Sequence, residues 1–107
     1  VKVSYRCIAP PVYNDFELTH LVEEAAVSLL GKTNVIKLDK PSLGAEDFAV
    51  FLKDVPGTMF RLGVAGEGGC APLHNGEFSL DEKCLQIGVE VLTMTILSWI
   101  NKRTLTQ

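Results

Sequence analysis

The pattern of apolar and polar residues predicts two helices. Over about Asp15–Leu30, leucine, valine and alanine recur at intervals of three and four residues, with charged residues on the opposite side, as in an amphipathic helix. Asn14, with Glu17 three residues later, predicts the N-terminal cap, and Gly31 predicts the end of the helix. A second helix is predicted from about Leu80 to near Lys102.

The second helix is apolar on two sides, and Ser79 with Glu82 predicts its cap. A helix with two apolar sides is expected to be covered on both, either within a larger protein or by self-association. One stripe consists of Leu85, Val89, Leu92, Ile96, Trp99 and Ile100, and the nearly opposite stripe consists of Ile87, Val91 and Met94.

Three segments have the features of strands. Residues 1–8 alternate apolar and polar positions up to Pro10, and 35–38 and 58–64 are short apolar runs between turn residues. Residues 46–53 could form two further helical turns. This alternation of strands and helices predicts an α/β fold, with helices packed on a mixed, at least partly parallel sheet.

Composition narrows the class of protein. The chain has 107 residues, 47% of them hydrophobic and 21% charged, which predicts one soluble globular unit. The net charge of -3 and the absence of a basic stripe argue against nucleic acid as a partner. Three widely spaced cysteines favour a reducing, cytoplasmic setting. The longest apolar stretch, 91–100, is interrupted by polar residues and too short to span a membrane.

Two motifs carry a family resemblance. Residues 44–48 read Gly-Ala-Glu-Asp-Phe, and Leu73-His74 lies in a glycine-rich loop downstream. Together they resemble the C-terminal signature of the binuclear-metal amidohydrolases, which include aminoacylases, hippurate hydrolases and auxin-conjugate hydrolases. The resemblance covers Pro10 to about Ile100. It implies that residues 1–9 are the last strand of an inserted lid or dimerisation domain and that 10–107 are the C-terminal portion of the catalytic domain.

The resemblance makes His74 a metal ligand, although an isolated loop histidine is ordinarily just a solvated side chain. A catalytic zinc site needs about three protein ligands, so His74 would hold only part of a site. The resemblance places the other ligands (a cysteine, two histidines and a glutamate) and the general base in an N-terminal half. It therefore implies no catalytic residue within this chain, and two divalent ions, zinc, manganese or cobalt, in the parent enzyme.

Gly44, Glu46 and Asp47 are the candidate substrate-binding residues. The resemblance places their loop in the wall of the active site, where glycine lets the backbone approach closely. Successive side chains on a helix point about 100° apart, so at most one of the two carboxylates could face the metals. Both carboxylates could instead simply stabilise the start of a helix. Cys70 and His74 have no second pair at ligand spacing, so a self-sufficient zinc site is not expected.

The resemblance implies hydrolysis of N-acyl-amino acids by metal-activated water. The expected partners are the small-molecule substrate, the rest of the parent enzyme and, in a homo-oligomer, further copies. Two alternatives remain open. The chain could be a stand-alone α/β interaction or dimerisation module without catalysis, or it could belong to a related metallopeptidase or desuccinylase.

Overall fold

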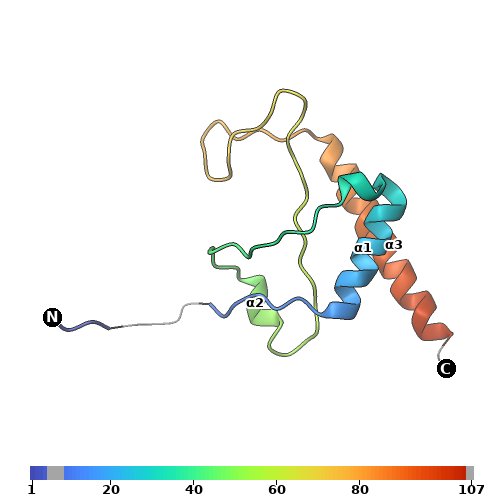
Figure 1. Cartoon of the computed structure of the whole chain (residues 1–107), viewed down its shortest axis with the longest axis horizontal. Helices are drawn as coiled ribbons and strands as arrows, with labels where there is room; N and C mark the ends of the chain where they lie inside the picture. The colour runs from blue at the N-terminus through green and yellow to red at the C-terminus, as the bar shows by residue number, and fades with distance from the viewer. Residues whose placement is uncertain (5–8, 106–107) are drawn as a thin grey trace.

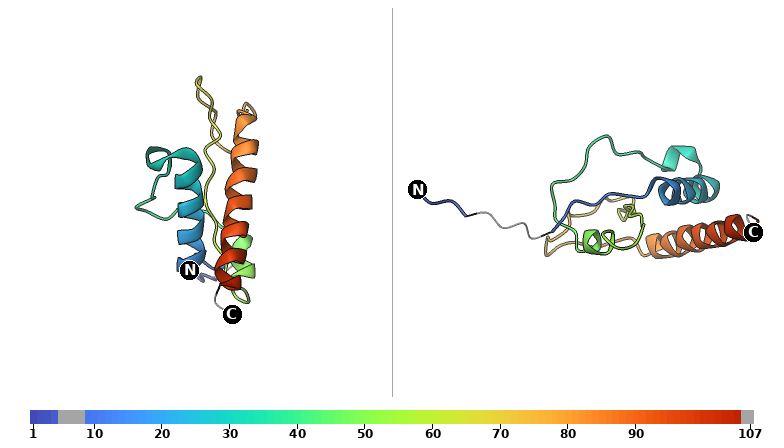
Figure 2. Two further views of the ribbon diagram at one scale, coloured as in Figure 1. Left: turned by 90° about the vertical axis from the view of Figure 1, so that its right-hand side faces the viewer. Right: turned by 90° about the horizontal axis from the view of Figure 1, so that it is seen from below.

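Two antiparallel helices form the centre of the molecule. The computed structural model describes residues 1–4 and 9–105. Helix α1 spans Phe16–Leu30 and helix α3 spans Lys83–Thr104. They pack side by side and run in opposite directions (Figure 1 and Figure 2, left). Both predicted long helices are therefore present.

The contact between α1 and α3 contains most of the buried apolar residues. On α1 the buried side chains are those of Leu21, Val22 and Ala25, all on the predicted apolar stripe. On α3 they are those of Cys84 and Val91. Full burial of one aliphatic side chain contributes roughly 1.5–3 kcal/mol, so these few residues are the main source of cohesion.

The start of α1 differs from the sequence prediction by one residue. Asp15, and not Asn14, is the N-cap, and its Oδ1 accepts a 2.9 Å hydrogen bond from the Leu18 N–H. Asn14 is engaged elsewhere: its Nδ2 donates to the Met59 carbonyl and its Oδ1 accepts from the Met59 N–H, both at 2.9 Å. Both residue types are good caps, and the long-range contact decides which one serves.

The C-terminal end of α1 has the predicted glycine. Gly31 has a φ of 81°, and its N–H donates to the Val27 carbonyl at 2.9 Å. A short 3₁₀ helix, η1 (Lys32–Asn34), follows, and the Asn34 side chain donates to the Leu30 carbonyl at 2.7 Å. These bonds satisfy carbonyls that the end of a helix leaves unpaired.

The predicted α/β sheet is absent from the part of the chain that the structure describes, so that fold class is wrong. Residues 35–38 and 58–64 form no strands, and the one β pairing among the described residues is the isolated bridge between Gly66 and Gly69. Residues 1–4 have no regular structure, and the remainder of the predicted first strand, residues 5–8, lies outside the described residues.

The physical reason is that apolar alternation indicates which side chains are buried without supplying a neighbouring strand. Backbone groups of 58–64 bind to other elements instead: Met59 binds the Asn14 side chain, and the Val64 carbonyl accepts a 2.9 Å hydrogen bond from the Asp81 N–H. Residues 58–64 are therefore anchored at both ends without strand pairing.

Helix α2 (Phe48–Phe51) is one turn long, where the sequence suggested two, and Ala49 is buried. The segment after it is fastened to the start of α1. The Asp15 N–H donates to the Gly57 carbonyl at 2.8 Å, and the hydroxyls of Thr19 and Thr58 lie 2.8 Å apart. Residues 44–48 therefore lead into a turn that is anchored on α1.

Helix α3 begins at Lys83, three residues later than predicted, and the Ser79–Glu82 capping box does not form. Asp81 serves this end instead, because its Oδ1 accepts from the Lys83 N–H and its carbonyl accepts from the Cys84 N–H, both at 3.0 Å. By length and composition alone α3 could cross a membrane: it has 22 residues and a mean hydropathy of 1.3.

The two stripes of α3 have different environments. Val91, from the smaller stripe, is 2% exposed, and Ile87 is half-buried. The larger stripe is left open to solvent, with Val89 at 65% and Ile96 at 56% exposure. The buried side of α3 thus includes Val91 and Ile87 of the smaller stripe but not Met94, which is 36% exposed.

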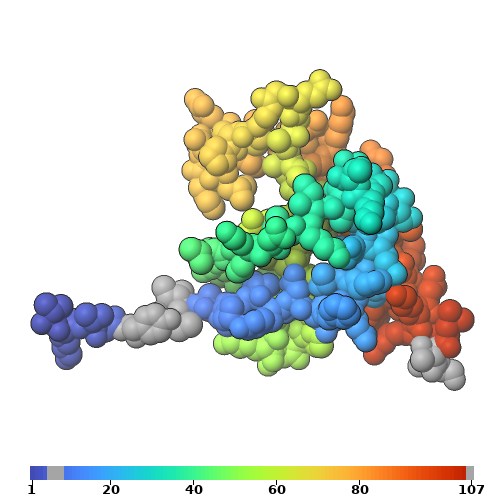
Figure 3. All heavy atoms as spheres, in the orientation of Figure 1, coloured from blue at the N-terminus to red at the C-terminus, as the bar shows by residue number. Residues whose placement is uncertain are grey.

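The molecule is less compact than a globular domain of the same length. Its radius of gyration is 17.0 Å, whereas a compact domain of this size would have about 13 Å. The extents of 60 × 43 × 21 Å reflect residues 1–4, which lie farthest from the helix pair, and loops that spread to the same side (Figures 1 and 3). A single pair of helices offers too little apolar surface for these loops to pack against.

Replacement of Gly57 tests the attachment of the α2 turn. A Cβ at Gly57 would lie 2.7 Å from Cδ2 of Leu52 and 3.3 Å from Cζ of Phe48. We expect Gly57→Ala to lower the free energy of unfolding by roughly 0.5–1.5 kcal/mol, because the ends of the Leu52 and Phe48 side chains must leave their preferred rotamers to make room. Gly63→Ala is the matched control, since its Cβ would meet nothing within 4 Å. Urea denaturation of both variants measures the difference, and equal stabilities would contradict the packing described.

Candidate functional site

The loop that carries His74 is closed at its base. The hydrogen bond from the Asp81 N–H to the Val64 carbonyl joins its two ends, immediately before α3 begins. Within the loop, Gly69 has a φ of 81° and its N–H donates to the Gly66 carbonyl at 2.9 Å. Figure 1 shows this yellow to orange loop projecting away from α1. The sequence pattern did not reveal the role of Asp81.

Cys70 ties the two sides of the loop together. Its Sγ donates to the Ser79 carbonyl at 2.9 Å and lies 3.2 Å from the Ala71 carbonyl oxygen. Cys70 and Cys84 are both free thiols, Cys84 being buried on α3, while Cys7 lies outside the described residues. The Cys70 thiol therefore has a structural role within the loop.

His74 lies in a tight turn at the exposed side of this loop. The Asn75 N–H donates to the Pro72 carbonyl at 3.2 Å, and Oδ1 of Asn75 accepts from the Glu77 N–H at 2.8 Å. Among the described residues, His74 is the one non-glycine residue with a positive φ, 68°. Such a conformation is uncommon and tends to occur at functional sites. Asn75-Gly76 begins the next turn, in which the Phe78 N–H donates to the Asn75 carbonyl at 3.0 Å.

The three candidate substrate-binding residues are all exposed. Gly44 is uncrowded: a Cβ added there would have Oγ of Ser42, at 4.0 Å, as its nearest neighbour. The carbonyls of Glu46 and Asp47 accept from Ala49 and Val50 at the start of α2. Asp47 is the N-cap residue, but its side chain makes no capping bond. The helix-cap explanation is thus not supported for the Asp47 carboxylate.

The structure does not bring His74 and residues 44–47 into direct contact. Among the described residues, no hydrogen bond or ion pair joins the two segments. In Figure 3 the His74 loop stands apart from the green segment that leads into α2, with a notch between them. No group of three or more His, Cys, Asp or Glu side chains in the described part of the chain could hold a metal ion. A metal held by His74 would therefore need ligands from outside the described residues.

The two hollows described for the surface lie away from His74. One, of about 320 Å³, is lined by Tyr13, Asp15 and residues 52–57. The other, of about 530 Å³, lies where the start of α1 meets the end of α3, between Phe16, His20 and Trp99 among others. Neither includes a candidate site residue, so neither is assigned to the substrate.

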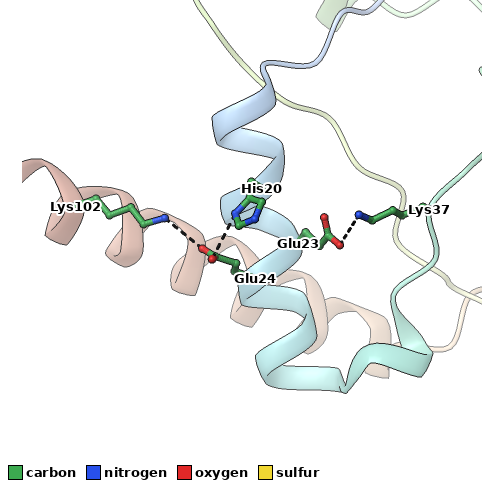
Figure 4. A network of polar contacts seen from close by, with 5 residues as sticks. All are labelled: His20, Glu23, Glu24, Lys37 and Lys102. Carbon is green, nitrogen blue, oxygen red and sulfur yellow. Dashed lines mark hydrogen bonds and ion pairs between the residues drawn. The ribbon is translucent and has the colours of Figure 1, made fainter.

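Ion pairs connect α1 to its neighbours (Figure 4). Nζ of Lys37 lies 2.8 Å from Oε1 of Glu23, and this hydrogen-bonded cation lowers the pKa of the Glu23 carboxyl. Glu24 binds Lys102 of α3 at 3.3 Å and lies 3.4 Å from Nδ1 of His20. His20 is thus on an exposed face of α1, as the sequence predicted. The Glu23–Lys37 pair anchors the segment that leads toward residues 44–47.

Comparison with known proteins identifies the family. The model of peptidase family M20/M25/M40 matches residues 1–98. The chain belongs to this family. The binuclear-metal amidohydrolase resemblance seen in residues 44–48 and in Leu73-His74 is confirmed. Several relatives have the names of hydrolases, so this chain is part of a hydrolase family.

Three relatives show what the match covers. A protein named "probable hydrolase" from Synechocystis sp. is 41% identical over 101 residues, 92% of this chain and 25% of that protein. N-acetyldiaminopimelate deacetylase from Pediococcus pentosaceus is 34% identical over 94 residues, 86% of this chain and 23% of the enzyme. Thermostable carboxypeptidase 1 from Saccharolobus solfataricus is 33% identical over 97 residues, 89% and 24% of the two chains.

The chain spans about a quarter of the length of these relatives. No solved structure matches it significantly. The family assignment therefore rests on sequence, and it covers both segments that carry candidate site residues.

The Glu23–Lys37 pair gives a pH prediction. A carboxyl with a lowered folded-state pKa stabilises the fold above the ordinary glutamate pKa, and this contribution is lost as the pH falls through the lowered value. We expect Lys37→Ala to raise the pKa of Glu23 toward its ordinary range, because the largest cause of the shift is the Lys37 hydrogen bond. NMR titration of the Glu23 carboxyl measures this, with Lys53→Ala as the control. An unchanged titration in Lys37→Ala would contradict the pair.

Proposed function

We propose that this chain is the C-terminal part of a metal-dependent amidohydrolase that cleaves N-acyl-amino acids. The observation that carries the proposal is His74, exposed and held at a φ of 68° in a loop that is tied at its base. In a chain that belongs to the M20/M25/M40 family, this is the conformation expected of a positioned ligand. The deacetylase relative, whose name describes removal of an acetyl group from an amino acid, supports the substrate class.

The residues of this chain would form the active site together with residues from the rest of the polypeptide. His74 would offer an imidazole lone pair to one of two divalent ions, zinc, manganese or cobalt. When bound, such ions polarise the amide carbonyl and supply hydroxide near neutral pH. The loop of Gly44, Glu46 and Asp47 would border the substrate, with one of the two unengaged carboxylates facing it.

The assignment of residues 1–9 to a lid or dimerisation domain and of 10–107 to the catalytic domain is part of the same proposal. So are the remaining ligands, the general base, the homo-oligomeric state and the cytoplasmic location. What supports the fragment assignment is the length of the relatives, of which this chain spans about a quarter.

Two other functions have some support. The carboxypeptidase relative favours peptides as substrates, and such a substrate would still need metal-activated water. A stand-alone interaction module is favoured by the exposed apolar stripe of α3. The backbone conformation of His74 fits peptide hydrolysis as well as N-acyl-amino acid hydrolysis, whereas an interaction module gives no reason for it.

The isolated chain should not hydrolyse acetyl- or benzoyl-amino acids with added zinc, manganese or cobalt. The reason is that the described residues contain no group of three potential ligands, whereas a catalytic zinc site needs about three. A spectrophotometric assay of amide cleavage tests this. Turnover that His74→Asn abolished would show that a complete site exists within these 107 residues.

Metal binding by His74 can be measured in a chimera, in which this chain replaces the matched quarter of the Synechocystis relative. We expect His74→Asn to lose one bound metal and most turnover, because one of about three protein ligands is removed. Asparagine is the suitable replacement since it tolerates a positive φ, so the loop should be retained.

His20→Asn is the matched control. His20 is an exposed histidine of α1 that lies beside Glu24, and its replacement should leave metal content and turnover unchanged. Elemental analysis and kcat of the two variants decide the matter. Full metal content and normal kcat in His74→Asn would refute the assignment of His74 as a ligand.

A further inference from the structure

The side-chain amide of Asn75 is held by its oxygen and not by its nitrogen. Oδ1 accepts a 2.8 Å hydrogen bond from the Glu77 N–H, and among the described residues Nδ2 has no partner. Two other exposed asparagines differ in this respect. Nδ2 of Asn14 donates to the Met59 carbonyl, and Nδ2 of Asn34 donates to a carbonyl of α1. The amide nitrogen of Asn75 is therefore not retained by a hydrogen bond within this part of the chain.

The residue after Asn75 is a glycine that the fold does not require. Among the described residues the glycines with a positive φ are Gly31 and Gly69, so Gly76 does not serve a left-handed turn, and a Cβ there would meet nothing within 4 Å. What glycine changes at this position is access, because no side chain shields its backbone nitrogen. Each of the other three asparagines precedes a residue with a side chain, namely Asp15, Val35 and, within α3, Lys102.

The hydrogen bond from Glu77 folds the Asn75 amide back toward Gly76. The ring that this bond closes contains both Cγ of Asn75 and the nitrogen of Gly76, so these two atoms are held close together. If the nitrogen attacks Cγ, negative charge develops on Oδ1, and the Glu77 N–H already donates to that oxygen at 2.8 Å. A backbone donor at this distance stabilises such a charge. The turn is therefore arranged for attack of the backbone on the side chain.

We propose that Asn75 is a site of spontaneous deamidation through a cyclic imide. The Gly76 nitrogen forms a bond to Cγ of Asn75, the bond from Cγ to Nδ2 breaks, and Nδ2 leaves as ammonia with the proton of the Gly76 N–H. Water then opens the imide. Cleavage at Cγ gives aspartate, and cleavage at the backbone carbonyl carbon gives isoaspartate. Water is the one co-reactant, and no oxidation or reduction takes place.

Both products change the surroundings of His74. Aspartate places a negative charge on the neighbouring residue and makes the bond from the Glu77 N–H charge-assisted. Isoaspartate adds a methylene to the backbone and converts the Asn75 carbonyl, which accepts from the Phe78 N–H at 3.0 Å, into a carboxylate. This consequence for a metal at His74 rests on the proposed function, whereas the modification itself does not. Isoaspartate would displace the ligand, so metal content would fall as the protein ages.

Peptide mapping by mass spectrometry, after incubation of the chain in neutral buffer and in urea, tests the proposal. We expect the peptide that contains Asn75 to gain the mass difference between an amide and an acid and to separate into aspartate and isoaspartate forms. Asn14, Asn34 and Asn101 should keep their amides in buffer. Conversion of Asn75 should be no slower in buffer than in urea, because the folded turn favours the attack.

Gly76→Pro should abolish the conversion, since the nitrogen of proline carries no proton to lose and cannot form the imide. Proline is favoured at this second position of a turn, so the turn should be retained. Gly68→Ala is the matched control. It changes another glycine of the same loop whose Cβ would meet nothing within 4 Å, and it should leave the conversion of Asn75 unchanged.

Four results would overturn the proposal. Slower conversion in buffer than in urea would show that the turn protects the amide, and an intact Asn75 under both conditions would show that no reaction occurs. Conversion that persists in Gly76→Pro would exclude the imide route. A chain whose circular dichroism in buffer lacks the helical signal of α1 and α3 would not contain the turn at all. The measurement needs neither metal nor turnover, so the proposed function can fail while the modification stands.

Discussion

The packing of α1 against α3 is the contact on which the rest of the molecule depends. The two helices are in contact, and most of the buried side chains lie on them, those of Leu21, Val22 and Ala25 on α1 and of Cys84 and Val91 on α3, although the two elements are separated by some fifty residues of chain. The intervening chain is attached to the pair at several points, among them the Glu23–Lys37 ion pair, the Asp15–Gly57 and Asn14–Met59 bonds near the start of α1, and the Val64–Asp81 bond near the start of α3. If the helices separated, the loops would no longer be held in fixed positions relative to one another.

The two helices were predictable because the residues of each helix contain the pattern that identifies it. The apolar stripe of α1 and the glycine at its end are local properties, and local sequence decides them. The cap was ambiguous between Asn14 and Asp15 because only a contact 45 residues away distinguishes them. The sheet was wrongly predicted for the same kind of reason. Residues 35–38 and 58–64 have the composition of strands, but a strand also needs a second strand beside it, and the sequence of one segment does not show whether that partner exists. On α3 the periodicity revealed two stripes and could not say which one is the more buried.

The sequence motifs named the candidate site residues, but they did not predict how those residues are arranged in space. The motifs at 44–48 and at Leu73-His74 identified the family, which the match over residues 1–98 confirms. The left-handed backbone of His74, the thiol tie from Cys70 and the helix-start role of Asp81 became visible only in three dimensions. The assignments of His74, Gly44, Glu46 and Asp47 remain predictions, because the groups that would complete a metal centre are not among the described residues.

The closed base of the His74 loop has a consequence for how such proteins can diversify. Because the Val64 carbonyl and the Asp81 N–H meet at 2.9 Å, the ends of the loop occupy fixed positions whatever lies between them. The entropy of closing a loop rises only slowly with its length. Insertions, deletions and exchanges between residues 65 and 80 can therefore accumulate with little effect on α3. Around Leu73-His74, this part of the chain can therefore change without disturbing the packing of the helix pair, so new preferences can arise in the rest of the loop.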